Sequence, residues 1–150
     1  MTDILKVRSI SIWIFLIPFF SVNICLIIIT NFHQFLEPGI PINQTFPYFD
    51  GGVSISRTVR NFPMSLIFKP AMFMTSYLLI IYWLNTKKII QKFKNNYPNT
   101  KKIIFFGVGS AILLTIHAIF LGIKFDNDFY KLFRRIIMLS FIIFELIAQA

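Results

Sequence analysis

Charge is scarce in this sequence, and acidic residues are the scarcest of all. Only 14% of the 150 residues are charged, with 15 Lys and Arg against 6 Asp and Glu, whereas a soluble domain has about 25%. Hydrophobic residues make up 56% of the chain and lie in long blocks. This pattern excludes a soluble globular domain, a disordered chain and a coiled coil, and it predicts a membrane protein.

Cysteine is nearly absent as well. The single Cys25 lies inside the first apolar block, so an internal disulfide is excluded. One cysteine with only His33 and His117 makes a poor zinc set, and the sequence predicts no metal and no other cofactor. It also lacks the G-x-S-x-G, H-E-x-x-H and P-loop motifs that mark hydrolases and nucleotide-binding proteins.

Four apolar blocks are present. They cover residues 10–30, 64–84, 103–123 and 133–150. A membrane-spanning helix needs about 20 mostly apolar residues, and the first block is too long for the apolar core of a signal peptide, which predicts an uncleaved anchor. The fourth block is short, so either its helix begins earlier, near Phe129, or the chain continues beyond Ala150. We expect one all-α domain, an integral membrane helical bundle with four spans.

The segments between the blocks differ in charge. Segment 86–102 carries six lysines and no acid, whereas 31–62 balances two acids with two arginines. Because basic connections remain in the cytoplasm, we predict a cytoplasmic N-terminus, a cytoplasmic 86–102 loop and an outer 31–62 loop. Segment 124–135 would also lie outside although it is mildly basic. Topology explains the basic charge, so nucleic acid is not a predicted partner, although the lysines could also bind anionic lipid headgroups.

The outer loop, residues 31–62, carries the most specific pattern. Its prolines and glycines disfavour a continuous helix, yet several of its residues are apolar, and loops longer than about 12–15 residues are often functional. Three short motifs lie in or just after it: Pro47-Tyr48-Phe49-Asp50-Gly51-Gly52 followed by Val53-Ser54-Ile55-Ser56-Arg57, then Asn61-Phe62-Pro63, then Phe68-Lys69-Pro70.

These motifs resemble those of the Frag/DRAM/Sfk family of multi-span membrane proteins. That family carries a Pro-Tyr-Ile-Ser-Asp-Thr-Gly type motif in its first outer loop, and this chain has one residue fewer between Tyr48 and Asp50. The resemblance implies about six spans, two of them beyond Ala150, and a protein that binds, senses or organises membrane lipids through its outer loop. Abundant residues with A/T-rich codons favour a bacterial inner membrane over a eukaryotic endomembrane.

Polar residues within the apolar blocks are candidate site residues, because a charged group at the helix centre costs about 2.5–3.5 kcal/mol. Four such residues are present: Asn23, Lys69, His117 and Glu145. Counted along the predicted spans, they lie roughly 9–15 Å below the outer surface of the membrane. Above them, the outer loop offers groups that could hold a phosphate headgroup: Asp50, Ser54, Ser56, Arg57 and Arg60.

Each candidate also has a purely structural explanation. Lys69 can extend its ammonium group to the headgroups, and His117 can make an interhelical hydrogen bond. Glu145 can pair within the bundle, with Lys69 as one possible partner. Asp50 can be a turn residue, and the two arginines can belong to an amphipathic helix at the membrane surface.

Three functions remain open. The first is a protein that binds or organises lipids, with membrane lipids and possibly another membrane protein as partners. The second is an intramembrane lipid-modifying enzyme, a hydrolase or acyl-transfer protein, using Asp50, His117 and Glu145. It would require His117 within about 3 Å of an acid. The third is a small transporter or accessory subunit, with a water path to Glu145.

Two patterns concern helix packing. Gly107 and Ala111 form a small-xxx-small pair, which predicts a close approach of another helix. Tyr77, Tyr82 and Trp83 lie toward one end of the second block, which predicts an aromatic belt at the membrane interface.

Overall fold

The computed structural model describes residues 2–31, 58–59, 62–93, 100–121, 123 and 128–150, and these residues contain helices and no strand. The helices are α1 (Thr2–Asn31), α4 (Met64–Phe93), α5 (Thr100–Phe120) and α6 (Asp128–Gln149). Each of them overlaps one apolar block of the sequence. The predicted all-α architecture is confirmed.

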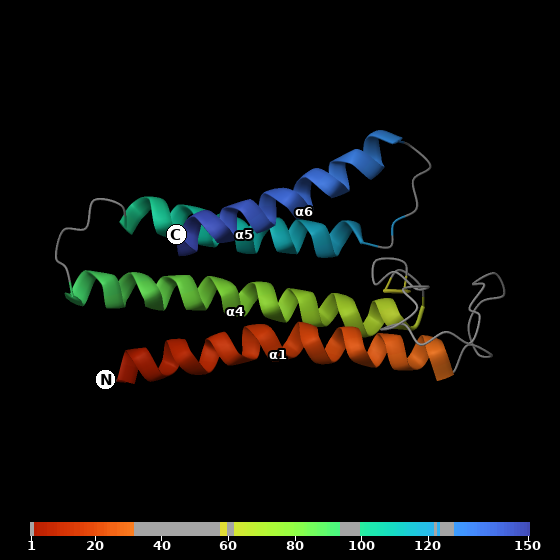
Figure 1. The fold of residues 1–150 in the computed structure, drawn as a ribbon, viewed down its shortest axis with the longest axis horizontal. Helices are drawn as coiled ribbons and strands as arrows, with labels where there is room; N and C mark the ends of the chain where they lie inside the picture. The colour runs from red at the N-terminus through yellow and green to blue at the C-terminus, as the bar shows by residue number, and fades with distance from the viewer. Residues whose placement is uncertain (1, 32–57, 60–61, 94–99, 122, 124–127) are drawn as a thin grey trace.

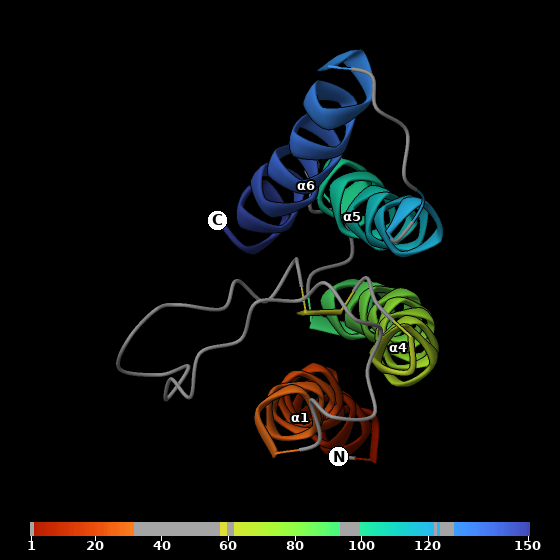
Figure 2. The ribbon, with the colours of Figure 1, turned by 90° about the vertical axis from the view of Figure 1, so that its right-hand side faces the viewer.

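Successive helices run in opposite directions and pack in chain order (Figure 1). α4 packs against α1, α5 against α4, and α6 against α5. Figure 2 shows this series from the end, with α1 and α6 at opposite extremes. Within the described residues, α1 and α6 share no substantial contact. The bundle is therefore open and does not close into a ring.

Three of the four helices are long and apolar enough to cross a membrane: α1 from Asp3 to Asn31, α4 and α5. α6 is not among them, because Arg134, Arg135 and Glu145 interrupt its apolar sequence. It begins at Asp128, five residues before the predicted block, which agrees with the expectation of an earlier start.

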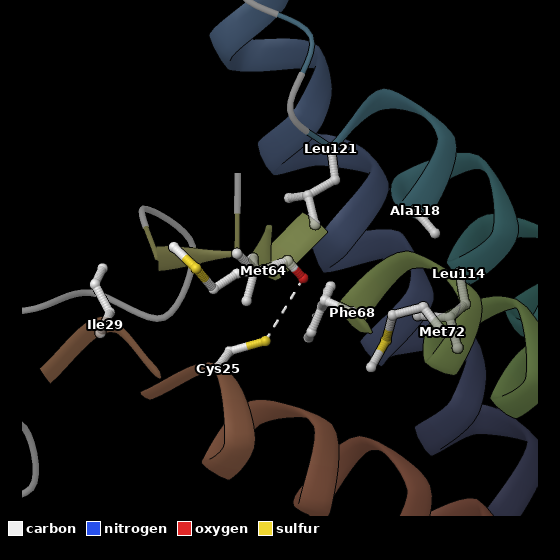
Figure 3. Packing of buried hydrophobic residues seen from close by; sticks show 9 residues of the cluster. Cys25, Ile29, Met64, Phe68, Met72, Leu114, Ala118 and Leu121 are labelled. Carbon is white, nitrogen blue, oxygen red and sulfur yellow. Dashed lines mark hydrogen bonds between the residues drawn. The ribbon is translucent and has the colours of Figure 1, made fainter. Parts of the chain in front are cut away.

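One hydrophobic core lies where the end of α1 meets the start of α4 and the end of α5 (Figure 3). The Cys25 thiol points at the Met64 carbonyl oxygen, 3.6 Å away. Phe68 and Leu121 complete the contact between helices. Cys25 is fully buried, so it acts as a small apolar residue that lets α1 approach α4 closely.

A second core lies toward the other end of the bundle. It is formed by Leu79 and Trp83 of α4, Ala111 of α5 and Ala148 of α6. The Trp83 ring lies so close to Gly107 that a Cβ atom there would be 2.2 Å from Trp83 Cδ2. The close packing predicted at Gly107 and Ala111 is confirmed. The Trp83 ring, which the sequence predicts to be part of an aromatic belt at the membrane interface, is buried between helices.

Lys92 near the end of α4 forms an ion pair with Asp3 at the start of α1. The pair ties together the two helix ends at one side of the bundle. The lysines at the end of α4 and the start of α5 lie at this same side (Figure 1), as the antiparallel arrangement requires.

Candidate functional site

A polar cluster joins α5 to α6 around Glu145. The Ser110 hydroxyl donates to Glu145 Oε2 at 2.6 Å, and the Gln149 side chain donates to Glu145 Oε1 at 2.9 Å. Ser110 is fully buried and also lies 2.7 Å from the Gly107 carbonyl oxygen. Glu145 is half-buried and Gln149 is exposed, so the cluster reaches from the helix interface to the protein surface.

The depth of this cluster follows from α5. The helix has 21 residues and is about 31 Å long, close to the roughly 30 Å of a bilayer's hydrocarbon core. Ser110 is its middle residue. Because Glu145 bonds to Ser110, its carboxyl group lies near the bilayer centre if α5 spans the membrane.

A second polar contact joins α4 to α5. The Ser76 hydroxyl lies 2.6 Å from the Ala111 carbonyl oxygen and 2.6 Å from Thr115 Oγ1. Thr115 in turn lies 3.0 Å from the same carbonyl. Ser76 is buried, and in hydrocarbon such a hydroxyl needs a partner. This contact therefore sets the register between α4 and α5.

Replacing Ser76 by alanine should destabilise the α4–α5 contact by about 0.6 kcal/mol, the average for hydrogen bonds between membrane helices, and by no more than about 1.7 kcal/mol. Equilibrium unfolding in mixed detergent micelles measures the change. Ser11→Ala is the matched control, because among the described residues Ser11 bonds to the Arg8 carbonyl of its own helix alone. Equal stability of the two variants would contradict a role for Ser76 between helices.

Asn23 and Lys69 lie on the first two helices. The Asn23 side chain donates to the Phe19 carbonyl oxygen at 2.6 Å. Lys69 is half-buried on α4, five residues after Met64, about 7.5 Å along the helix axis. This position is shallow enough for the ammonium group to reach lipid headgroups.

An open groove runs along α1 beside Asn23. Its volume is about 430 Å³, and it extends from Ile14 to Leu26 past Pro18. Phe15 and Phe19 stack on one another along it, with ring centroids 5.6 Å apart. Its surface is almost wholly apolar, with the Asn23 amide as the polar group.

The structure does not gather the four intramembrane candidates into one cluster. Asn23 and Glu145 belong to α1 and α6, the two ends of the series. His117 is half-buried on α5, seven residues from Ser110, or about 10 Å along the axis. The described residues place Ser110 and Gln149 on Glu145, and neither His117 nor Lys69 is in this cluster.

The remaining candidates lie outside the described residues. They are Asp50, Ser54, Ser56, Arg57 and Arg60. In the part of the chain that the structure describes, no three His, Cys, Asp or Glu side chains come together as a metal-binding group.

Ser76, Ser110 and Thr115 are the polar residues that sequence reasoning missed. Ser110 lies between Gly109 and Ala111 in the sequence, and these small neighbours suggest that it serves only helix packing. The signal that could have found it is the spacing of Ser110 and Thr115, which places two hydroxyl groups on adjoining faces of one apolar helix. Comparison with known proteins adds no further assignment, because no family model, curated protein or solved structure matches this chain.

Proposed function

We propose that this chain is a multi-span membrane protein that binds membrane lipid, as its resemblance to the Frag/DRAM/Sfk family implies, and that one acyl chain lies in the groove along α1. The proposal includes the orientation that the charges favour, with the N-terminus in the cytoplasm of a bacterial cell and segment 31–62 outside. The α1 groove is the observation that carries the proposal.

The length and apolar lining of the groove suit an acyl chain. The groove is shallow and is lined by residues of α1 alone, so an acyl chain would lie along the helix surface and would not be enclosed. The path from Ile14 to Leu26 is about 18 Å long, and the rings of Phe15 and Phe19, which are 65% and 48% exposed, stack along it.

The groove is also polarised. Asn23 lines it toward the Asn31 end of α1, and that end leads into the segment with Arg57 and Arg60. A lipid with its tail in the groove would direct its phosphate toward this end, and guanidinium groups such as those of Arg57 and Arg60 in the following segment of the sequence bind phosphate in bidentate fashion.

A photoactivatable phospholipid with a diazirine in its acyl chain tests this proposal on the full chain in vesicles. Cross-links should concentrate between residues 14 and 26, and Phe19→Ala should lower them about threefold or more, which corresponds to roughly 0.65 kcal/mol. Phe20→Ala is the matched control, because Phe20 is 55% exposed against 48% for Phe19 but does not line the groove. Equal labelling of the two variants, or uniform labelling of all lipid-facing surfaces, would refute a lipid site on α1.

A further inference from the structure

Aromatic contacts hold the start of α6 against the end of α5. The Tyr130 hydroxyl donates to the Phe120 carbonyl oxygen at 2.6 Å. The Phe120 ring packs edge-to-face on Tyr130 and on Phe133, with ring centroids 6.3 Å and 5.5 Å apart. The Tyr130 ring is therefore fixed at two points, by its hydroxyl group and by the neighbouring Phe120 ring.

Arg134 lies one turn after Tyr130, on the same side of α6. Its guanidinium carbon is 5.9 Å from the centroid of the Tyr130 ring, within the distance of a cation–π interaction. Arg134 is half-buried, and its Nε atom is enclosed and has no hydrogen-bond partner among the described residues. The fixed Tyr130 ring thus restricts the position of the guanidinium before any ligand binds.

No acid of the described residues neutralises this guanidinium with an ion pair. Asp128, the acid at the start of α6, pairs with Lys131 at 2.9 Å. Glu145 lies eleven residues beyond Arg134 and bonds to Ser110. Because charges removed from water are normally paired, the half-buried guanidinium favours an anion that approaches from outside these helices.

The depth of this group follows from α5. Phe120 is ten residues after Ser110, the middle residue of α5, so it lies about 15 Å from the middle. Half of a hydrocarbon core is also about 15 Å. Since Tyr130 bonds to the Phe120 carbonyl, the Tyr130–Arg134 pair lies at the edge of the core. At either face of a bilayer, the anions just beyond this edge are lipid phosphates.

Membrane orientation does not account for the basic residues at this end of the bundle. The lysines around the α4–α5 connection are explained by their retention in the cytoplasm. Arg134 and Arg135 lie near the start of α6, at the other end of the bundle from these lysines (Figure 1). There the same rule favours few basic residues, so a different reason for their presence is required.

We infer that Arg134, held on the Tyr130 ring, binds the phosphodiester group of an anionic phospholipid at the α5–α6 end of the bundle. A guanidinium donates two parallel hydrogen bonds to phosphate oxygens. The first two turns of α6 carry Lys131, Arg134 and Arg135 against Asp128, a net charge of +2, which disfavours the cationic group of a zwitterionic headgroup. The site is separate from the α1 groove, because α1 and α6 share no substantial contact within the described residues.

Titration of the full chain with phosphatidylglycerol, followed by native mass spectrometry from detergent micelles, tests this site. Arg134→Ala should weaken the binding of one phosphatidylglycerol about tenfold, or ~1.4 kcal/mol. Arg135→Ala is the matched control, because it removes the same charge from the next residue, which is exposed, and it should weaken binding about threefold or less. Phosphatidylcholine should bind more weakly and equally to both variants, which also shows that they are folded.

Equal losses for the two arginine variants would reduce the effect to diffuse charge and overturn the inference. Unchanged phosphatidylglycerol binding by Arg134→Ala, as when a carboxylate of another segment neutralises the guanidinium, would overturn it as well. Phe19→Ala should leave this binding unchanged, because Phe19 lines the α1 groove. A failure of the α1 lipid site and a failure of the Arg134 site are therefore distinguishable.

Two further measurements test the aromatic support and the source of the phosphate. Tyr130→Leu keeps every charge but removes the ring, and it should weaken phosphatidylglycerol binding about threefold or more, whereas Tyr130→Phe should lose less. Equal binding by Tyr130→Leu and the unmodified chain would contradict the role of the ring. Inorganic phosphate should not displace the lipid when compared with chloride at equal ionic strength. Displacement by millimolar phosphate would assign the site to a soluble phosphate and overturn its assignment to lipid.

Discussion

Replacing Gly107 by leucine should disrupt the packing of α4 against α5 more than any other single change in the described helices. A Cβ atom alone at this position would lie 2.2 Å from Trp83 Cδ2 and 2.5 Å from Trp83 Cε2. Trp83 is buried, so its ring cannot move aside without opening the second core. Overpacking usually costs about 1–3 kcal/mol, and the contact here leads us to expect the upper part of that range or more.

Equilibrium unfolding in mixed micelles measures this loss, and two variants make the result specific. Gly109→Ala should cost less, because its Cβ would lie 2.9 Å from Cδ2 of the Phe144 ring, and this ring is half-buried and can shift more easily than buried Trp83. Trp83→Leu should recover part of the stability lost in a Gly107→Ala chain by making room for the methyl group. Similar losses for the two glycines, or no recovery in the double variant, would contradict the close contact.

Neutralising the lysines around the α4–α5 connection should change the orientation of the protein in the membrane. The residues to be replaced by glutamine are Lys87, Lys88, Lys92, Lys94, Lys101 and Lys102. Afterwards Lys6 and Arg8 alone would remain as basic residues on the predicted cytoplasmic side. The opposite side would keep Arg57, Arg60, Lys124, Lys131, Arg134 and Arg135. Because basic residues set the orientation, we expect a mixed or inverted population.

Labelling of single cysteines with a membrane-impermeant maleimide measures the orientation. In the unmodified charge background, cysteines placed in 31–62 should be labelled from outside intact cells, and cysteines in 86–102 only after the cells are opened. The neutralised chain should show both patterns or the reverse. A chain with six conservative Lys→Arg changes is the matched control and should keep the original orientation. Labelling of both loops from the same side in the unmodified background would refute the predicted topology.

The helices themselves were predictable from the sequence because their signal is local. Apolar blocks of sufficient length and the charged segments between them are one-dimensional features, and each of the four blocks overlaps one helix. The start of α6 at Asp128 was less evident. Basic residues in its first two turns make this part of the helix too polar to be recognised as part of an apolar block. Close packing at Gly107 was predictable because glycine has no side chain and therefore lets a neighbouring helix approach closely.

The partners of the polar residues were not predictable. Four polar side chains at similar predicted depth suggested one cluster, because the position of a residue within a span gives its depth in the membrane. The sequence does not show which neighbouring helix each side chain faces, since that depends on how the helices pack. The chain-order stacking places Asn23 and Glu145 at opposite extremes and gives Glu145 the neighbours Ser110 and Gln149.

The sequence by itself therefore determined the membrane environment, the four helices and the charge asymmetry between their connections. Only the tertiary structure decided which faces of the helices meet protein. The physical reason is that lipid tails are as apolar as leucine, so burial against a neighbouring helix and exposure to the bilayer require the same residues. Trp83 illustrates this: its sequence position suits the membrane interface, and its packing on Gly107 places it inside the protein.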